Sequence, residues 1–263
     1  MTLDSGQVFH WEKVGNGFVG AIGEEPVYVE QRSESLRVSH GARELVGNYF
    51  ALDHPLAEIC ASLPNDPAMQ AASAFCRGLR IMRQPRWECL ATFITSSMKQ
   101  VAHIRQISRT LRERFGKMRS LGKSTLYLFP AQPRIGELDE PTLRQCALGY
   151  RAKNLLATAR LVASGEVNLD ALARLPDDEL RARLCALPGV GAKVANCVML
   201  FAYERLRAFP IDVWIERVLK QQYFPRKRKV KAQQLREFCD RYFGEHGGYA
   251  QQYLFHHARM GSR

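Results

Sequence analysis

A lysine and an aspartate are the two side chains of this sequence whose types and spacing favour a covalent reaction. Lys193 closes the run Leu187-Pro188-Gly189-Val190-Gly191-Ala192-Lys193, and Asp212 follows nineteen residues later in Phe209-Pro210-Ile211-Asp212-Val213-Trp214. A lysine amine in its uncharged form is a nucleophile that builds Schiff bases. A carboxylate beside it can accept a proton from the amine or stabilise positive charge on a substrate. The pair predicts nucleophilic catalysis with an acidic partner.

The residues around Lys193 predict a helix, a tight turn and a second helix. Pro188 ends the first helix, and Gly189 and Gly191 allow positive φ and leave no side chain between the backbone and a ligand. The N–H groups at the start of the second helix can then point at an anion such as a DNA phosphate. Apolar residues recur at helical spacing on both sides of the turn: Leu184, Leu187, Val194, Cys197, Val198, Leu200 and Phe201. Residues 187–191 are therefore expected to form a phosphate-binding hairpin.

The expected positions of the two reactive residues favour their chemistry. Lys193 falls in the first turn of the second helix, where the positive end of the helix disfavours an ammonium group and increases the fraction of free amine. Asp212 follows Pro210 and precedes an amphipathic run through Gln221, which is typical of a helix N-cap. Each residue also has a simpler reading, because such hairpins often serve as nonspecific DNA clamps and an aspartate is often only a cap. Their occurrence together favours catalysis.

The length, hydrophobic content and net charge of the chain indicate a folded protein with an anionic binding partner. The chain has 263 residues, 46% of them hydrophobic, and a formal net charge of +12. It can bury the core of one large or two small domains, and its charge predicts an anionic partner, most often nucleic acid. A ribosomal or membrane-surface protein stays open from charge alone. No apolar run is long enough to span a membrane and no signal pattern is found, so a soluble intracellular protein is expected.

The cysteines predict neither disulfides nor a metal site. There are seven, scattered along the chain and without a C-x-x-C pair. This spacing does not match a disulfide framework, a zinc site or a four-cysteine iron–sulfur cluster. We expect no metal and no cofactor, apart from a structural cation that the hairpin could hold.

The texture of the sequence changes along the chain. Short alternating runs predict a small antiparallel sheet with strands at Val8–Trp11, Gly17–Ile22, Val27–Glu30 and Leu36–Val38. Helices are expected near Arg43–Phe50 and Pro55–Leu63. From about Met69 the pattern is helical to the end, including the segment before Gly122. The expected fold class is α+β: an N-terminal antiparallel sheet domain with helices, residues 1–78, followed by an all-α core of two subdomains, residues 79–263.

The sequence resembles the 8-oxoguanine DNA glycosylase/AP lyase branch of the helix-hairpin-helix (HhH-GPD) DNA glycosylase superfamily. The likeness covers almost the whole chain, and its stretches occur in the order of the family. Beside the hairpin and Asp212 they are Ser5–Trp11, Glu88–Leu90, Phe93–Ser97, Leu148–Lys153 and Gly248–Phe255. A hairpin alone is common in DNA-binding proteins, whereas the ordered set is specific. The resemblance implies a helix-hairpin-helix glycosylase core and a reaction in which Lys193 and Asp212 are catalytic.

The resemblance also implies which residues recognise the base. Gly6 matches a glycine whose carbonyl accepts the N7–H that oxidised guanine carries and normal guanine lacks. Normal guanine would place a lone pair against that buried carbonyl, and this penalty supplies the discrimination. Cys197 and Phe255 match residues on the two faces of the flipped base, and Gln251 matches the residue that bonds its Watson–Crick edge. From the sequence alone, Cys197 and Phe255 would be core residues.

Contacts to DNA are implied at several further positions. Tyr150 and Arg151 match a pair that inserts into the stack and contacts the partner base. The hairpin residues Gly189, Val190 and Gly191 match the phosphate contacts. Met98 and His103 replace two cytosine-contacting residues of eukaryotic members, and Trp214 replaces a histidine of many relatives. These departures predict a weaker dependence on the base opposite the lesion.

The expected protein is a bifunctional DNA glycosylase/AP lyase acting on duplex DNA that contains oxidised guanine. A related glycosylase for another damaged base, such as an alkylated purine, and a noncatalytic lesion-binding protein are the alternatives. We expect a monomer, associated with the nucleoid in the cytoplasm of a prokaryote or located in the nucleus of a eukaryote. The basic run at residues 226–231 predicts a solvated loop near the DNA, or a nuclear import signal if the source has a nucleus.

Overall fold

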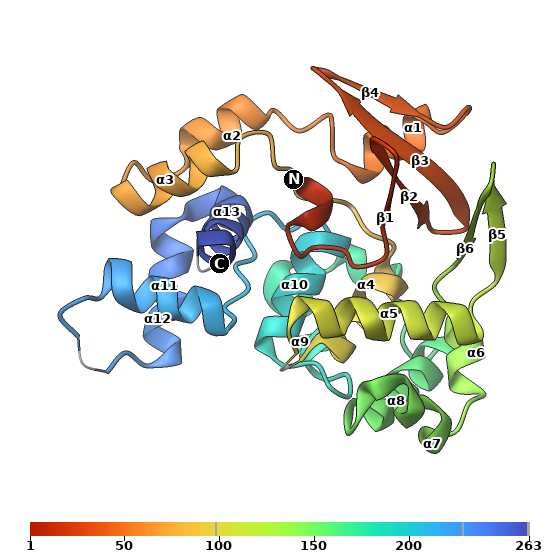
Figure 1. Ribbon diagram of the computed structural model, residues 1–263. Coiled ribbons are helices and arrows are strands. Elements are labelled where there is room, and N and C mark those ends of the chain that lie inside the picture. Colours follow the sequence, from red (N-terminus) through yellow and green to blue (C-terminus); the bar gives the residue numbers. More distant parts are fainter. Residues whose placement is uncertain (98, 228, 262–263) are drawn as a thin grey trace.

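The computed structural model describes residues 1–97, 99–227 and 229–261, and it places a small sheet beside a helical core (Figure 1). The expected α+β fold class is confirmed. The sheet is antiparallel and its strands neighbour one another in chain order: β1 Glu12–Val14, β2 Gly17–Ile22, β3 Glu25–Arg32 and β4 Ser35–Val38. Gly15 and Gly23 take positive φ in the first two turns, as tight hairpin connections require.

The sheet buries one face against a helix. In the register of β2 and β3, Val19 pairs with Tyr28 and Gly20 with Val27. Val27 and Val29 are buried together with Val46 of the first helix, α1 (Arg43–Tyr49). This alternation of buried and exposed residues in β3 is the period-two pattern of a sheet with one covered face. The N-terminal helices are α1 Arg43–Tyr49, α2 Leu56–Ser62 and α3 Pro67–Phe75.

The expectation of a strand at Val8–Trp11 was wrong. The first residue that pairs with β2 is Glu12. Val8 and Phe9 lie in an irregular segment before it, and their side chains are buried. The Trp11 ring packs closely against Gly20 of β2, where an added Cβ would lie 2.5 Å from it. The apolar residues at Val8–Trp11 are therefore explained by burial of their side chains and not by pairing with a neighbouring strand.

The helical core contains one feature that the sequence did not predict. Strands β5 Met118–Leu121 and β6 Ser124–Tyr127 form an antiparallel hairpin, so the expectation of helix before Gly122 was wrong. Gly122 takes positive φ at the first of the two turn residues, which favours a tight hairpin. The helices of the core are α4 Arg86–Ser96, α5 Val101–Phe115, α6 Gln132–Gly136, α7 Glu140–Leu143, α8 Arg151–Ala163, α9 Asp177–Cys185, α10 Ala192–Ala202, α11 Val213–Tyr223, α12 Ala232–Tyr242 and α13 Gly247–Gly261.

The chain also contains short turns of other helix types. They are the 3-10 helices Thr2–Asp4, Ala171–Arg174 and Gly244–His246 and the π-helical turn Arg144–Leu148. The π-helical turn contains a kink, with Ala147 at positive φ two residues before Gly149. This kink reverses the chain into α8 and leaves Tyr150 at the start of that helix.

Helix α10 is the centre of the core. It packs against α4 and α9, and residues Val194 to Phe201 are all buried. Helices α2 and α3 contribute Ile59 and Met69 to the same hydrophobic cluster, and α3 packs on α13. The domain boundary at residue 78 stays a prediction. Across the described residues, no helix combines the length and the apolar character needed to cross a membrane.

Candidate active site

A cavity in the helical core collects the two reactive residues. It is lined by Gly6, Phe93, Lys193, Cys197, Phe201, Pro210, Asp212, Gln251, Gln252 and Phe255. Lys193 and Asp212 thus share one cavity with all four residues predicted to recognise a base. The cavity measures about 40 Å³, which is room for a few water molecules and not for a purine. We therefore expect a base that enters the cavity to displace lining side chains.

Lys193 is held at the start of α10 by the hairpin before it. Gly191 is the N-cap of the helix, so Lys193 stands in its first turn, as predicted. Its Nζ lies 5.2 Å from the centroid of the Phe93 ring. That ring is fixed in turn by stacking on Phe201, with centroids 5.5 Å apart. A cation over an aromatic face is attracted to it, so Phe93 limits where the amine can lie. Sequence reasoning gave Phe93 no role, because nothing in its spacing separates it from a core residue.

Asp212 is the N-cap of α11, as predicted. Its Oδ1 accepts a hydrogen bond of 2.8 Å from the Ile215 N–H. Burial raises the pKa of the Asp212 carboxyl above its ordinary value, although the Ile215 amide and the charge of Lys193 act in the opposite direction. Because burial destabilises the charged carboxylate, Asp212 accepts a proton more readily than an aspartate in water does.

Cys197 and Gln251 supply one apolar and one polar wall of the cavity. Burial raises the pKa of the Cys197 thiol to about 11, although nearby Lys193 lowers it, so the thiol is neutral at physiological pH. Gln251 is 4% exposed, and its Oε1 has no hydrogen-bond partner among the residues that the structure describes. A buried amide oxygen without a partner costs free energy unless a ligand supplies a donor. Gln251 is therefore placed to accept a hydrogen bond from a base.

Gly6 and Phe255 meet across the cavity from opposite ends of the chain. Gly6 has φ of +91°, and a Cβ at this position would lie 3.0 Å from Phe255 Cε1 and 3.1 Å from Arg259 Nη1. Both the backbone conformation and the close approach of the ring require glycine here. The guanidinium carbon of Arg259 lies 5.5 Å from the centroid of the Phe255 ring. The predicted base-recognition residues are thus brought together by the fold.

Helix α8 contacts the hairpin at residues 187–191 through two side chains. Thr158 Oγ1 donates a hydrogen bond of 3.0 Å to the Pro188 carbonyl, and Asn154 contacts Gly189. Gly189 has φ of +81°, as predicted, and a Cβ there would come within 2.7 Å of Asn154 Cβ. The expectation of positive φ at Gly191 was wrong, because Gly191 is an extended N-cap with φ of −97°. Val190 is buried, so only its backbone is available to a phosphate.

The two hairpin glycines should respond differently to alanine. Gly189→Ala is expected to lower the free energy of unfolding by roughly 2 kcal/mol, because of positive φ and the contact with Asn154. Gly191→Ala is expected to cost about 1 kcal/mol or less, since it changes only an N-cap with open space around it. Denaturant unfolding of both variants measures the difference. Equal destabilisation would contradict this account of the turn.

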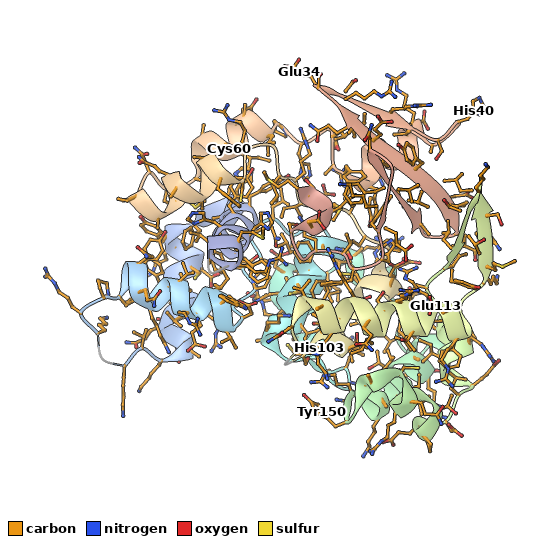
Figure 2. The ribbon with its side chains drawn as sticks, in the orientation of Figure 1. Glu34, His40, Cys60, His103, Glu113 and Tyr150 are labelled. Carbon is orange, nitrogen blue, oxygen red and sulfur yellow. The ribbon has the colours of Figure 1, made fainter. Side chains whose placement is uncertain are left out.

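Two of the remaining predicted DNA contacts, His103 and Tyr150, are exposed. Figure 2 shows His103 and Tyr150 on the same side of the molecule, near the starts of α5 and α8. Tyr150 is 57% exposed, and the guanidinium carbon of Arg151 lies 4.4 Å from its ring centroid. Arg151 itself is buried and donates hydrogen bonds to the carbonyls of Ser97 and Leu148. Trp214 is not among the residues that line the cavity, and Met98 lies outside the described residues.

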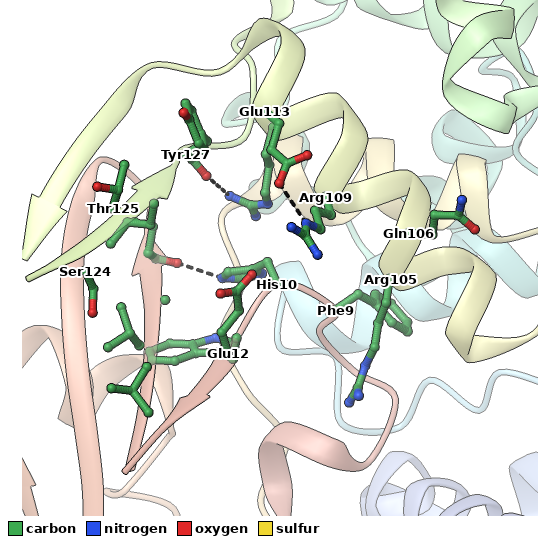
Figure 3. A pocket seen from close by; sticks show the side chains of 17 residues that line it. Phe9, His10, Glu12, Arg105, Gln106, Arg109, Glu113, Ser124, Thr125 and Tyr127 are labelled. Carbon is green, nitrogen blue, oxygen red and sulfur yellow. Dashed lines mark hydrogen bonds and ion pairs between the residues drawn. The ribbon is translucent and has the colours of Figure 1, made fainter.

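A larger cavity of about 550 Å³ lies between α5, the β5–β6 hairpin and the N-terminal segment (Figure 3). It contains none of the predicted site residues. Its arginines are each ion-paired with a carboxylate: Arg105 with Asp4, Arg109 with Glu113 and Arg112 with Glu88. The cavity therefore offers no unpaired arginine to an anion, and it is separate from the cavity that contains Lys193.

Two protein-family models together match most of the chain, and both describe DNA glycosylases or base-excision repair proteins. A family model described as the N-terminal domain of 8-oxoguanine DNA glycosylase matches residues 1–90. A second, described as HhH-GPD superfamily base excision DNA repair protein, matches residues 91–242. The chain is 28% identical to the N-glycosylase/DNA lyase OGG1 of Arabidopsis thaliana over an alignment of 276 positions, covering 97% of this chain and 75% of that protein.

Solved structures extend the likeness to the fold. The Clostridium acetobutylicum 8-oxoguanine glycosylase/lyase, in complex with double-stranded DNA containing cytosine opposite 8-oxoguanine, is 31% identical with a TM-score of 0.93. That match covers 99% of this chain and 91% of the other. MBOgg1 in complex with a low affinity DNA ligand is 32% identical with a TM-score of 0.94, covering 100% and 92% of the two chains. The chain therefore belongs to the 8-oxoguanine DNA glycosylase/lyase family within the HhH-GPD superfamily of base-excision DNA repair proteins.

Proposed function

We propose that the protein removes 8-oxoguanine from duplex DNA and then incises the strand, as a bifunctional glycosylase/lyase of base-excision repair. The observation that carries the proposal is one cavity that holds a lysine amine, a buried carboxylate and an amide oxygen without a partner. A noncatalytic lesion-binding protein would have no need of the first two. A glycosylase for alkylated bases would have no need of the Lys193 amine as a nucleophile.

The reaction begins with extrusion of the damaged nucleotide, because C1′ of a stacked nucleotide is out of reach of any side chain. Asp212 stabilises the positive charge that develops on the sugar and assists loss of the Lys193 proton. The free amine attacks C1′, a carbon–nitrogen bond forms, and the glycosidic bond breaks with its electron pair leaving on the base. The base then takes up a proton. The Lys193 nitrogen then loses a proton, and its lone pair breaks the C1′–O4′ bond while O4′ takes up a proton, so the sugar ring opens to a protonated imine. This imine acidifies the C2′ proton, whose removal expels the 3′ phosphate by β-elimination.

The protein groups supply every step, so we propose that the activity needs neither a metal nor a cofactor. Among the described residues, no group of three or more His, Cys, Asp and Glu side chains is arranged to hold a metal ion. The structural cation at the hairpin stays a proposal of its own. The test is a duplex oligonucleotide with one 8-oxoguanine, assayed in EDTA for free base and for a nicked strand. A second duplex with one 3-methyladenine tests the alternative substrate, which release of 3-methyladenine without release of 8-oxoguanine would support.

Excision should depend weakly on the base opposite the lesion. His103 is exposed and stands where eukaryotic relatives are expected to have an arginine, and the Arg151 guanidinium is already bonded to backbone carbonyls. Contacts that would favour cytosine are thereby reduced. A base contact worth about 1–3 kcal/mol would favour cytosine by roughly 5- to 150-fold. Without these contacts, single-turnover rates opposite the four bases are expected to agree within about tenfold. A much stronger cytosine requirement would contradict the prediction.

The setting of the reaction follows from its substrate. We propose that a monomer acts on chromosomal DNA, at the nucleoid of a prokaryotic cell or in the nucleus of a eukaryotic one. The formal charge of +12 favours binding to any duplex, and the salt dependence of that binding reports the number of phosphates contacted.

A further inference from the structure

The segment that carries Gly6 has an unusual pattern of carbonyl hydrogen bonds. The Ser5 carbonyl accepts a bond of 2.8 Å from Gln252 Nε2, and the Gln7 carbonyl accepts one of 2.9 Å from Gln84 Nε2. Within the described part of the chain, the Gly6 carbonyl between them accepts no hydrogen bond. Of three successive carbonyls, the two outer ones are thus occupied, and the one that belongs to a cavity-lining residue is available.

The two glutamines reach this segment from different elements. Gln252 lies on α13 and is 2% exposed, and Gln84 lies just before α4 and is 8% exposed. Each is an amide without charge, buried, and bonded through its donor to one loop carbonyl. A buried amide donor has few other partners, so each bond fixes its carbonyl in one position. Figure 1 shows the N-terminal segment lying next to α13, which agrees with this attachment.

Further bonds fix the same segment from the other side. Gln7 Nε2 donates to Ser5 Oγ at 3.0 Å and to the Arg80 carbonyl at 2.8 Å, while Gln7 Oε1 accepts from the Met82 N–H at 3.0 Å. The Gly6 peptide is therefore held between α13 and residues 80–84. Its position depends on side chains that never contact a base.

We propose that Gln252 and Gln84 are positioning residues for lesion discrimination, because they select which carbonyl of the segment is offered to the base. The inference rests on the proposed function and concerns the same site. If the Gly6 carbonyl distinguishes 8-oxoguanine from guanine, it must stay in one position. A carbonyl that could turn away would no longer repel the N7 lone pair of normal guanine, and the two bases would bind alike. Loss of either amide donor leaves a buried carbonyl without a partner and frees the segment to reorient.

The experiment compares base excision with strand cleavage at a preformed abasic site. Cleavage at an abasic site uses Lys193 and DNA binding but has no base to recognise. Gln252→Met and Gln84→Met preserve side-chain length and remove the donor. For each variant, the ratio of 8-oxoguanine excision rate to abasic-site cleavage rate is expected to fall by about tenfold to a hundredfold, the effect of a misplaced site group. Gln70→Met, an exposed substitution on α3, is the control and should leave the ratio unchanged.

The outcomes separate this proposal from the proposed function. Wild-type protein that does not release 8-oxoguanine would overturn the function itself, whatever the variants do. An unchanged ratio in a variant with a cooperative melting transition would overturn the positioning role, because a structural role alone affects both activities together. If one variant fails to fold, the other decides, since the two glutamines lie on different elements. The double variant should lower the ratio less than the product of the single effects, because both act on one segment.

Discussion

Lys193→Gln is expected to abolish the covalent protein–DNA adduct that borohydride traps and to reduce base excision by on the order of 10³-fold or more. The substitution removes the one lysine among the described residues that line the cavity, while leaving the first turn of α10 able to form. Gel electrophoresis after reduction measures the adduct, and quantification of free 8-oxoguanine measures excision.

A matched control is available in Lys123→Gln. Lys123 is exposed in the turn between β5 and β6, away from the cavity that contains Lys193. This variant should form the adduct at the wild-type rate, and both variants should melt near the wild-type temperature. An adduct that persists in folded Lys193→Gln would show that another amine attacks the sugar, and the mechanism would have to be abandoned.

Asp212→Asn is expected to slow excision by about 10²- to 10³-fold and to leave DNA affinity almost unchanged. Asparagine can still accept the hydrogen bond of the Ile215 N–H, so the cap of α11 remains. Asp212→Ala loses the cap as well and should be less stable than Asp212→Asn by about 1 kcal/mol. The comparison separates the charge of the carboxylate from its structural role. An Asp212→Asn protein with wild-type turnover would exclude the carboxylate from the reaction.

The pH dependence of Asp212 has a definite sign. Burial raises the pKa of this carboxyl above 3.8, so folding favours its protonated form. That contribution to stability is fully present below pH 3.8 and is lost as the pH rises through the pKa of the folded state. At neutral pH, Asp212→Asn should therefore melt at a higher temperature than the wild type. Excision should also fall on the acid side at a higher pH than an ordinary aspartate would give.

The sequence predicted the parts of the site that depend on local structure. The hairpin glycine Gly189, the first-turn position of Lys193 and the cap at Asp212 each follow from neighbours within a few residues, and the structure has all three. The family resemblance identified the residues that come together from distant segments. Their catalytic and recognition roles stay predictions until the variants are measured.

The parts that the sequence did not predict depend on contacts between distant residues. Gln252 and Ser5 are separated by 247 positions, and no local pattern distinguishes a glutamine that bonds a remote carbonyl from one on the surface. Strands β5 and β6 pair only with each other, and the Gly122 turn between them resembles other glycine turns. The buried residues at Val8–Trp11 alternate without a partner strand. In each case the missing information was the identity of a tertiary neighbour.

Helix α8 gives the proposed DNA complex a fixed span. Tyr150 stands at its start and Thr158 donates a hydrogen bond to the hairpin, so eight residues, or about 12 Å of helix, separate the two points. If Tyr150 inserts into the base stack and the hairpin binds phosphates, as we propose, these two contacts keep a fixed separation, and we expect the duplex to bend to meet both. The elastic cost of that bend depends on the base steps beside the lesion. The same lesion should be processed more readily beside an easily kinked pyrimidine–purine step than inside a stiff adenine tract.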